Sequence, residues 1–531
     1  MSANTLKSVR GEPPAVGKFA GVSTADIISS THTEELVIAL CGPIGSPLHD
    51  VGEAIRQTLL SSFGYLNCTY LRLSTFIAEH AQTAGVAIPP AGEYARLVGM
   101  IDAGNKLREK YGNAILTELA INQIRFDRER HKADGKEPGY TARRVVHIID
   151  SIKNEDELAL LRLVYRDMLY VVGVYAPLPT REANLKDLGL STPQIYSLID
   201  RDSGEESKAG QTVGNTFPNC DFFLRTGDGT DSELHRRVER FLHLILGSQV
   251  ITPTYAETAM YAAAMASANS ACLSRQVGAT VTDGKGNILS IGWNDVPSVG
   301  GGLYSGGVHD HRCYNIAGGK CFNDTEKDWL AQEMIDALSE VIEPSKLARA
   351  KEILRNASKL KGLIEFSRAI HAEMHAILNA GKTAGDRLPG GKLFVTTYPC
   401  HSCARHIVAA GIAEVFYIEP YRKSLAIKLH GDAISEHEAD QGKVRILAFD
   451  GVAPSRYLTL FRVPQNSRKR DGKLITIPLK ESSPRIKKSM EALPALEGLV
   501  VQSLREKQLL SERGTEHEQP PTAPDTTQPE L

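Results

Sequence analysis

Runs of apolar residues alternate with amphipathic stretches along the first half of the chain. Four short runs, near residues 36–40, 66–73, 145–149 and 169–175, are rich in β-branched residues, as buried strands are. Helical periodicity fills the spaces between them, for example from Glu155 to Met168. Strands that alternate with helices in this way predict a parallel α/β sheet.

The second half begins with an alanine-rich helix at 254–270 and continues with another α/β pattern. Residues 277–283 and 287–293, joined by a glycine turn, predict a hairpin. Further strands are expected at 393–398, 414–419 and 444–449, with helices at 369–380 and 400–410 on either side of the first of them. This pattern predicts a second α/β domain with helices covering its sheet.

The same pattern divides the chain into four parts. We expect a flexible arm at 1–33, a first domain at 34–250, a second domain at 251–460, and a C-terminal part at 461–531. The last part consists of a linker, a helix and a disordered tail rich in proline, threonine and glutamine. Inside the second domain, an insertion at 298–366 starts with a glycine-rich loop and continues with two charged helices, which we expect to form an arm or an oligomer contact.

Composition narrows the function only slightly. The 531 residues are 42% hydrophobic and 23% charged, with a formal net charge of −2, so the overall charge gives no reason to expect nucleic acid as a partner. The N-terminal residues lack the apolar core of a signal peptide, and no later run approaches transmembrane length. Eight cysteines in so long a chain favour a reducing compartment. We therefore expect a cytoplasmic protein without a membrane partner.

Two short segments of the second domain carry the residue types of a metal centre. His371 and Glu373 stand near the start of one predicted helix, and Cys400 and Cys403 share the first turn of another helix that directly follows a strand. Two thiolates and an imidazole suit Zn²⁺, with the fourth tetrahedral position left for water. A lone C-x-x-C is equally compatible with a redox pair or a structural zinc site. The acid beside the ligands favours a catalytic zinc, because a structural site has no use for it.

The pattern H-x-E followed by P-C-x-x-C resembles that of the zinc-dependent cytidine and deoxycytidylate deaminases. The resemblance implies that His371, Cys400 and Cys403 bind Zn²⁺. It also implies that Glu373 moves protons while water replaces the amino group at C4 of cytosine, which leaves uracil as the product.

Two further segments, at 274–279 and 292–297, are similar to the deoxycytidylate deaminases. This similarity implies that Asn294 reaches the deoxyribose, that Tyr398 lies against the base, and that Ser274 and Arg275 lie near the phosphate. For each of them a turn or core position is the alternative. The insertion also contains four possible ligands of a second, structural zinc, as some deoxycytidylate deaminases carry: His309, His311, Cys313 and Cys321. Their irregular spacing is the alternative, because such a set can arise by chance in a loop.

The first domain begins like a phosphate-binding loop, in which a strand leads through a turn into a helix. The turn contains Gly42, Gly45 and Ser46. The loop motif G-x-x-x-x-G-K-[ST], however, would need Gly, Lys and Ser or Thr at positions that here hold Pro47, Leu48 and His49. The domain therefore looks like a degenerate P-loop domain of the nucleoside-monophosphate-kinase type. We expect it to sense nucleotides, dock a partner or remain as a relic scaffold rather than transfer phosphate.

A kinase-like domain in front of a deoxycytidylate deaminase resembles the bacterial anti-phage deoxycytidylate deaminases, which deplete cytosine deoxynucleotides during infection. The resemblance implies zinc-dependent deamination of dCMP or dCTP in a homo-oligomer. It also implies control by an inhibitory small RNA, which no residue here shows. Three alternatives stay open: a deaminase of cytosine or adenine in polynucleotides, which needs a basic groove; a nucleotide- or RNA-binding regulator with a structural zinc; and a bifunctional kinase and deaminase, which the missing lysine weakens.

Overall fold

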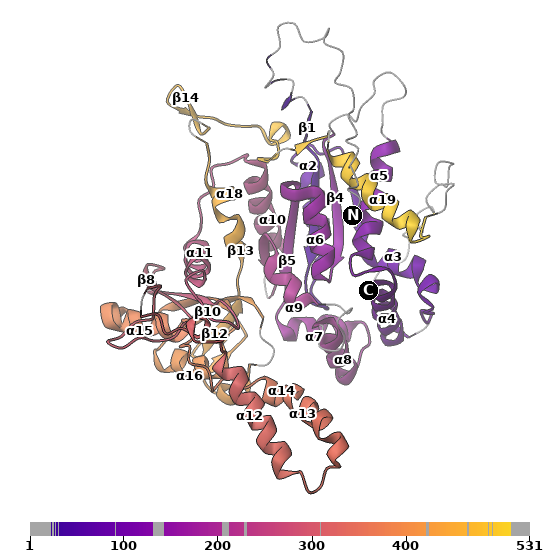
Figure 1. Cartoon of the computed structure of the whole chain (residues 1–531). Coiled ribbons are helices and arrows are strands. Elements are labelled where there is room, and N and C mark those ends of the chain that lie inside the picture. Colours follow the sequence, from indigo (N-terminus) through magenta and orange to yellow (C-terminus); the bar gives the residue numbers. More distant parts are fainter. Residues whose placement is uncertain are drawn as a thin grey trace, which may run out of the picture.

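The computed structural model describes residues 23, 26, 28, 29 and 31–510, except 91, 131–142, 204–211, 228–230, 308, 421–423, 465–466, 487 and 491. Most of the predicted arm and the whole predicted tail lie outside these ranges. Two sheets of six strands each form the centres of two α/β domains (Figure 1). Within the described ranges, no helix combines the length with the apolar character that a membrane crossing needs.

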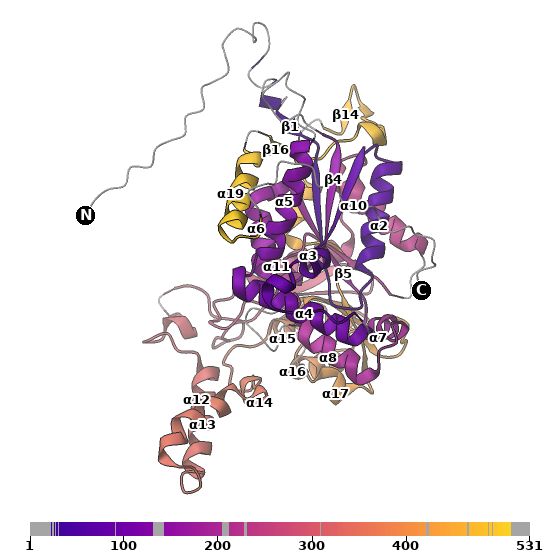
Figure 2. The same cartoon turned by 90° about the vertical axis from the view of Figure 1, so that its right-hand side faces the viewer.

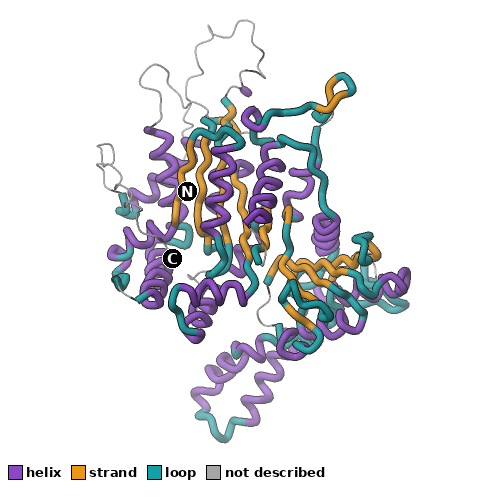
Figure 3. Tube along the Cα trace, turned by 180° about the vertical axis from the view of Figure 1, so that it is seen from behind, coloured by secondary structure: helices purple, strands orange, loops and turns teal. Residues whose placement is uncertain are grey.

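The first sheet has the strand order β13-β6-β5-β2-β4-β3, in which the last five strands are parallel. Four of them confirm the predicted parallel sheet: β2 Leu36–Cys41, β3 Asn67–Arg72, β4 Val145–Ile152 and β5 Leu169–Tyr175. The fifth, β6 Phe222–Arg225, extends the sheet beyond β5. Strand β2 is fully buried because helices cover both faces of the sheet (Figure 3). Its alternate side chains therefore enter two different apolar cores.

Helices α2 and α10 cover one face of this sheet, whereas α5 and α6 cover the other. Five more α-helices belong to residues 34–250, which makes nine in this described part of the chain. Their bounds are α2 Leu48–Ser61, α3 Leu73–His80, α4 Glu93–Tyr111, α5 Ile115–Arg130, α6 Glu155–Tyr165, α7 Leu178–Asp187, α8 Thr192–Ser203, α9 Val213–Thr216 and α10 Asp231–Leu246.

The second sheet has the order β11-β12-β10-β9-β7-β8, with an antiparallel hairpin at one edge and four parallel strands. Its strands are β7 Gly278–Thr282, β8 Ile288–Trp293, β9 Lys392–Thr397, β10 Glu414–Glu419, β11 Ile434–Ser435 and β12 Val444–Ala448. Its helices are α11 Tyr255–Ser267, α15 Ala372–Ala384, α16 His401–Ala409 and α17 Ala426–His430. All the predicted strands are confirmed, and only the two-residue β11 was not predicted.

Two glycines let helices lie directly on the hairpin of this sheet. A Cβ atom on Gly278 would stand 1.9 Å from the carbonyl oxygen of Ala263 in α11. On Gly292 it would stand 2.4 Å from the backbone nitrogen of Ala376 in α15. The close contact at Gly292 holds α15, which starts immediately after His371, against the sheet.

The predicted insertion forms a helical arm that projects from the second domain (Figures 1 and 2). It consists of α12 Phe322–Ala337, α13 Leu347–Asn356 and α14 Ser358–Lys361. Helices α12 and α13 pack on each other, and Arg355 links them through an ion pair with Asp324 at 3.1 Å. The two predicted insertion helices are thus confirmed, with a break between α13 and α14.

The structure differs from the predicted division at residue 460, because the chain returns to the first domain before that point. Strand β13, Gly451–Val452, pairs antiparallel with β6, and α18, Tyr457–Phe461, follows beside α10. Further on, β16 Lys488–Ser489 pairs with β1 His32–Thr33, and α19 Leu493–Glu506 packs on α5. Between them, β14 Lys469–Arg470 and β15 Lys473–Leu474 form a small ribbon. The first domain is therefore built from both ends of the chain.

A buried ion network holds α19 in place. Arg128 of α5 contacts Glu35 at 2.6 Å and Glu497 of α19 at 3.1 Å, and all three side chains are almost completely buried. Tyr165 donates a further hydrogen bond to Glu497 at 3.2 Å. Although burial alone would raise it, the neighbouring His147 and Arg128 lower the pKa of Glu35 to about 2.

We expect Glu497→Ala to lower the free energy of unfolding by about 3 kcal/mol, because it leaves part of the charge of Arg128 buried without its partner. Urea denaturation followed by circular dichroism measures this loss. Glu506→Ala, on the exposed side of the same helix, is the matched control and should change stability by less than about 0.5 kcal/mol. Equal effects of the two substitutions would contradict a role of the network in docking α19.

Candidate active site

Three side chains that the sequence places in two separate segments meet at the N-terminal ends of two helices. His371 directly precedes α15, Cys400 caps α16, and Cys403 lies in the first turn of α16. The Nδ1 atom of His371 is 3.3 Å from the sulfur of Cys400 and 3.2 Å from that of Cys403. In the part of the chain that the structure describes, this is the one group of at least three metal-binding side chains with ligand atoms within 4.8 Å of one another.

This trio fits Zn²⁺ in both chemistry and spacing. Tetrahedral bonds of about 2.0–2.3 Å would place imidazole nitrogen and thiolate sulfur about 3.5 Å apart, close to the observed distances. The backbone N–H of Cys403 points to the sulfur of Cys400 at 3.4 Å, as expected where a helix N-terminus favours a thiolate. A hydrogen bond from Cys403, together with the nearby His371, lowers the pKa of Cys400 to about 4. The pKa of the second thiol, Cys403, is raised by its contact with Cys400 and by burial. The centre thus offers Zn²⁺ the soft sulfur and imidazole ligands that it prefers.

Glu373 lies beside the trio but is not one of the grouped metal ligands. It is in the first turn of α15, and only 4% of it is exposed. Burial raises the pKa of its carboxyl group to about 7, while the neighbouring His371 opposes the shift. A buried carboxyl group of this kind can both accept and return a proton near neutral pH.

A cavity of about 390 Å³ opens onto the metal centre, and its volume suits a small ligand. His371, Cys400 and Glu373 line it. The structure also brings all four predicted substrate residues to its wall: Ser274, Arg275, Asn294 and Tyr398. Their contacts with a substrate remain predictions.

Two of these four residues already have partners within the chain. The side-chain amide of Asn294 accepts a hydrogen bond from the backbone N–H of Val277 at 2.7 Å and donates one to the carbonyl of Arg275 at 2.9 Å. Asn294 therefore fixes the cavity wall at 275–277. Arg275 forms a partly exposed ion pair with Glu419 at 2.9 Å, so a phosphate bound to Arg275 would compete with this carboxylate.

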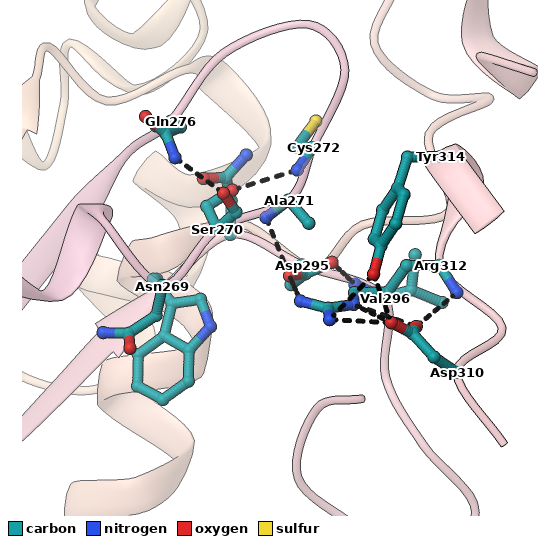
Figure 4. A network of polar contacts seen from close by, with 12 residues as sticks. Asn269, Ser270, Ala271, Cys272, Gln276, Asp295, Val296, Asp310, Arg312 and Tyr314 are labelled. Carbon is teal, nitrogen blue, oxygen red and sulfur yellow. Dashed lines mark hydrogen bonds and ion pairs between the residues drawn. The ribbon is translucent and has the colours of Figure 1, made fainter. Parts of the chain in front are cut away.

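A polar network that the sequence did not indicate holds another part of the cavity wall, at Ala271 and Asp295 (Figure 4). Asp295 accepts hydrogen bonds from the backbone of Ala271 at 3.0 Å and from Arg312 at 3.3 Å. Arg312 also pairs with Asp310 at 2.7 Å, and Tyr314 donates to the same carboxylate. The network ties the insertion to the segment that follows α11. Its only signal in the sequence is that Asp295 stands next to the predicted site residue Asn294.

The structure does not assemble the predicted second zinc site. Cys313 and Cys321 lie at the cavity wall, but His309 and His311 are exposed, and His311 stacks edge-on against Tyr304. Among the described residues, these four do not form a group with ligand atoms close together. The spacing of these four residues in the sequence therefore did not bring their ligand atoms together in the structure.

The predicted nucleotide loop lies in the first domain beside another cavity, of about 320 Å³, which Gly45 and Ser46 line. Gly42 and Gly45 allow the turn, with a φ of 83° at Gly45. Here the backbone N–H of Ile44 donates to the carboxylate of Asp202 at 2.7 Å. Lys153 bridges Asp202 and the carbonyl of Gly42 at 2.8 and 2.9 Å. An acidic side chain of the protein thus takes the loop amide that an anionic ligand would need.

We expect no ADP above background when the protein is incubated with ATP and dCMP. Leu48 stands in place of the phosphate-binding lysine, and the carboxylate of Asp202 already accepts the hydrogen bond of the loop amide of Ile44. A coupled ADP assay measures this, with dCMP omitted as the control. ADP formation that depends on dCMP would contradict the degenerate-loop interpretation.

Comparisons with known proteins place the relationship in the second domain. Residues 253–419, which contain His371, Glu373, Cys400 and Cys403, match the family described as "Cytidine and deoxycytidylate deaminase zinc-binding region". A deoxycytidylate deaminase of Enterobacteria phage T4 is 30% identical over 177 residues, which are 32% of this chain and 80% of the phage protein.

Two solved structures resemble parts of the chain. The dCMP deaminase of cyanophage S-TIM5 in complex with dCMP and dUMP is 23% identical and covers 38% of this chain and 99% of its own, with a TM-score of 0.23. Kti12 of Chaetomium thermophilum in complex with ADP-AlF3 is 12% identical and covers 39% of this chain and 96% of its own, with a TM-score of 0.23.

Proposed function

This chain belongs to the cytidine and deoxycytidylate deaminase family, and on this premise we propose that it deaminates deoxycytidine nucleotides, dCMP, dCTP or both, to deoxyuridine nucleotides. The observation that carries the proposal is the pairing of a His, Cys, Cys trio with a buried carboxyl group at the wall of one cavity. A purely structural zinc site would have no use for that carboxyl group. The regulator with a structural zinc is therefore the weaker alternative.

The residues of the chain divide the reaction between them. His371, Cys400 and Cys403 would hold Zn²⁺, which supplies the Lewis acidity that makes water nucleophilic at neutral pH. Glu373 takes the proton from the attacking water and returns protons to N3 of cytosine and to the departing ammonia. We assign Tyr398 to contact with the base and Arg275 to the phosphate, because both line the cavity.

The overall charge favours a free nucleotide over a polynucleotide as the substrate. The net charge of −2 gives no sign of the basic groove that a strand of nucleic acid requires, and the cavity of about 390 Å³ has room for a small ligand. Depletion of nucleotides in anti-phage defence, assembly into a homo-oligomer and control by a small RNA are supported by resemblance alone and stay predictions.

The proposal is tested by incubating the zinc-loaded protein separately with dCMP, dCTP, CMP and a single-stranded DNA that contains cytosine. Chromatography then separates the products. Uracil deoxynucleotides from dCMP or dCTP would support the proposal and determine how many phosphates the site accepts. Product from the DNA alone would overturn it in favour of a polynucleotide deaminase.

A further inference from the structure

Tyr398 forms part of the wall between the catalytic cavity and a second cavity. This second cavity, of about 490 Å³, lies between the two domains and is called the interdomain cavity here. Tyr175, Arg181 and Asp202 line it from the first domain, and Tyr417 and Glu436 line it from the second. Among the described residues, Tyr398 and Arg275 line both cavities. A change in the interdomain cavity that moves Tyr398 or Arg275 therefore also alters the wall of the catalytic cavity.

The hydroxyl end of Tyr398 is anchored on the interdomain side. It donates a hydrogen bond to Glu436 at 2.8 Å, directly after β11. Burial raises the pKa of Glu436. The aromatic ring of Tyr398 packs edge-on against that of Tyr417, with 4.9 Å between the ring centroids. Two contacts, one polar and one aromatic, thus fix the ring that faces the catalytic cavity.

Tyr175 connects the first domain to the same group of side chains. Tyr175, the last residue of β5, packs against the apolar cores of both domains. Its hydroxyl accepts a hydrogen bond from the hydroxyl of Tyr417 at 3.1 Å, and the two rings meet edge-on at 6.5 Å. Tyr417 is almost completely buried, whereas Tyr175 is half-buried, and both side chains line the interdomain cavity.

We propose that the first domain positions Tyr398 for catalysis through Tyr175 and Tyr417, and that Glu436 is the second positioning residue of the same ring. The proposal rests on the proposed deaminase function. The first domain then has a role in the reaction although its nucleotide loop is degenerate: it sets the ring against which the base of the substrate lies. Because β5 also pairs with β2, which leads into that loop, the ring is held by the central strands of the first sheet.

Steady-state kinetics with dCMP test the proposal on single-group substitutions. Tyr175→Phe removes only the hydroxyl, and Glu436→Ala removes the acceptor. Each should lower kcat/KM about three- to tenfold, the worth of one hydrogen bond. Glu436→Gln keeps an acceptor oxygen and should restore most of the activity. The matched control is Tyr170→Phe in the same strand, whose buried hydroxyl has no hydrogen-bond partner among the described residues, and it should stay within about twofold of wild type.

A double-mutant cycle separates positioning from general weakening of the fold. In a Tyr398→Ala background, Tyr175→Phe should have no further effect on kcat/KM, because the ring that it positions is gone. A persistent effect in that background, or equal kcat/KM for Tyr175→Phe and Tyr170→Phe, would overturn the inference while leaving the proposed function intact. A wild-type protein that deaminates no cytosine nucleotide would overturn both.

Discussion

Glu373→Gln should lower the rate of deamination by about 10³-fold while the protein keeps its zinc and its fold. The amide has nearly the shape of the carboxyl group but cannot carry a proton between water, N3 and the leaving ammonia, and general acid and base catalysis contributes about 10²- to 10⁴-fold. The substitution removes no ligand, because Glu373 lies outside the His, Cys, Cys trio. Product formation is measured by chromatography and zinc by elemental analysis of the same preparation.

The control for this experiment is Glu365→Gln. Glu365 lies near His401 at 3.4 Å but is exposed and does not line the catalytic cavity, so its neutralisation should leave the rate within about twofold of wild type. Loss of zinc from the Glu373→Gln protein would contradict the assignment, because it would make this side chain part of the metal site. Retained activity with full zinc content would exclude Glu373 as the proton carrier.

Cys403→Ser should remove both the zinc and the activity. Cys403 is fully buried with its sulfur 3.2 Å from Nδ1 of His371, and a serine hydroxyl is a hard, protonated ligand at neutral pH that replaces a thiolate poorly. We expect the bound zinc to fall from about one per chain to a small fraction, and deamination to fall below detection. Treatment of the wild-type protein with a chelator should have the same effect, and added Zn²⁺ should reverse it.

Cys68→Ser provides the matched comparison for this loss. Cys68 is a half-buried free thiol in β3 of the first domain, far along the chain from the trio. Its substitution should leave the zinc content unchanged. An equal loss of zinc in both variants would show that the metal binds elsewhere, and zinc retained by Cys403→Ser with normal activity would remove this cysteine from the site.

The sequence determined the metal centre because each of its parts is a local signal. The sequence shows within a few positions that His371 stands at the start of one helix and that the two cysteines stand at the start of another. The strand before Cys400 shows where that second helix begins. The alternation of strands and helices was equally local, and most strands of the two sheets followed from it. Strand β2 shows why such a strand can be recognised from the sequence. It is buried at every position, and a strand covered on both faces must be apolar throughout.

Only the tertiary structure decided which distant side chains meet. Period and composition can show that Tyr417 or Glu497 is buried, but not that their partners are Tyr175 and Arg128, which lie 242 and 369 positions away along the chain. The same reason explains why Asp202 at the nucleotide loop and the pairing of β13 with β6 were not predicted. Hydrogen bonds and ion pairs between separate elements depend on how the elements pack, and no local pattern records that packing.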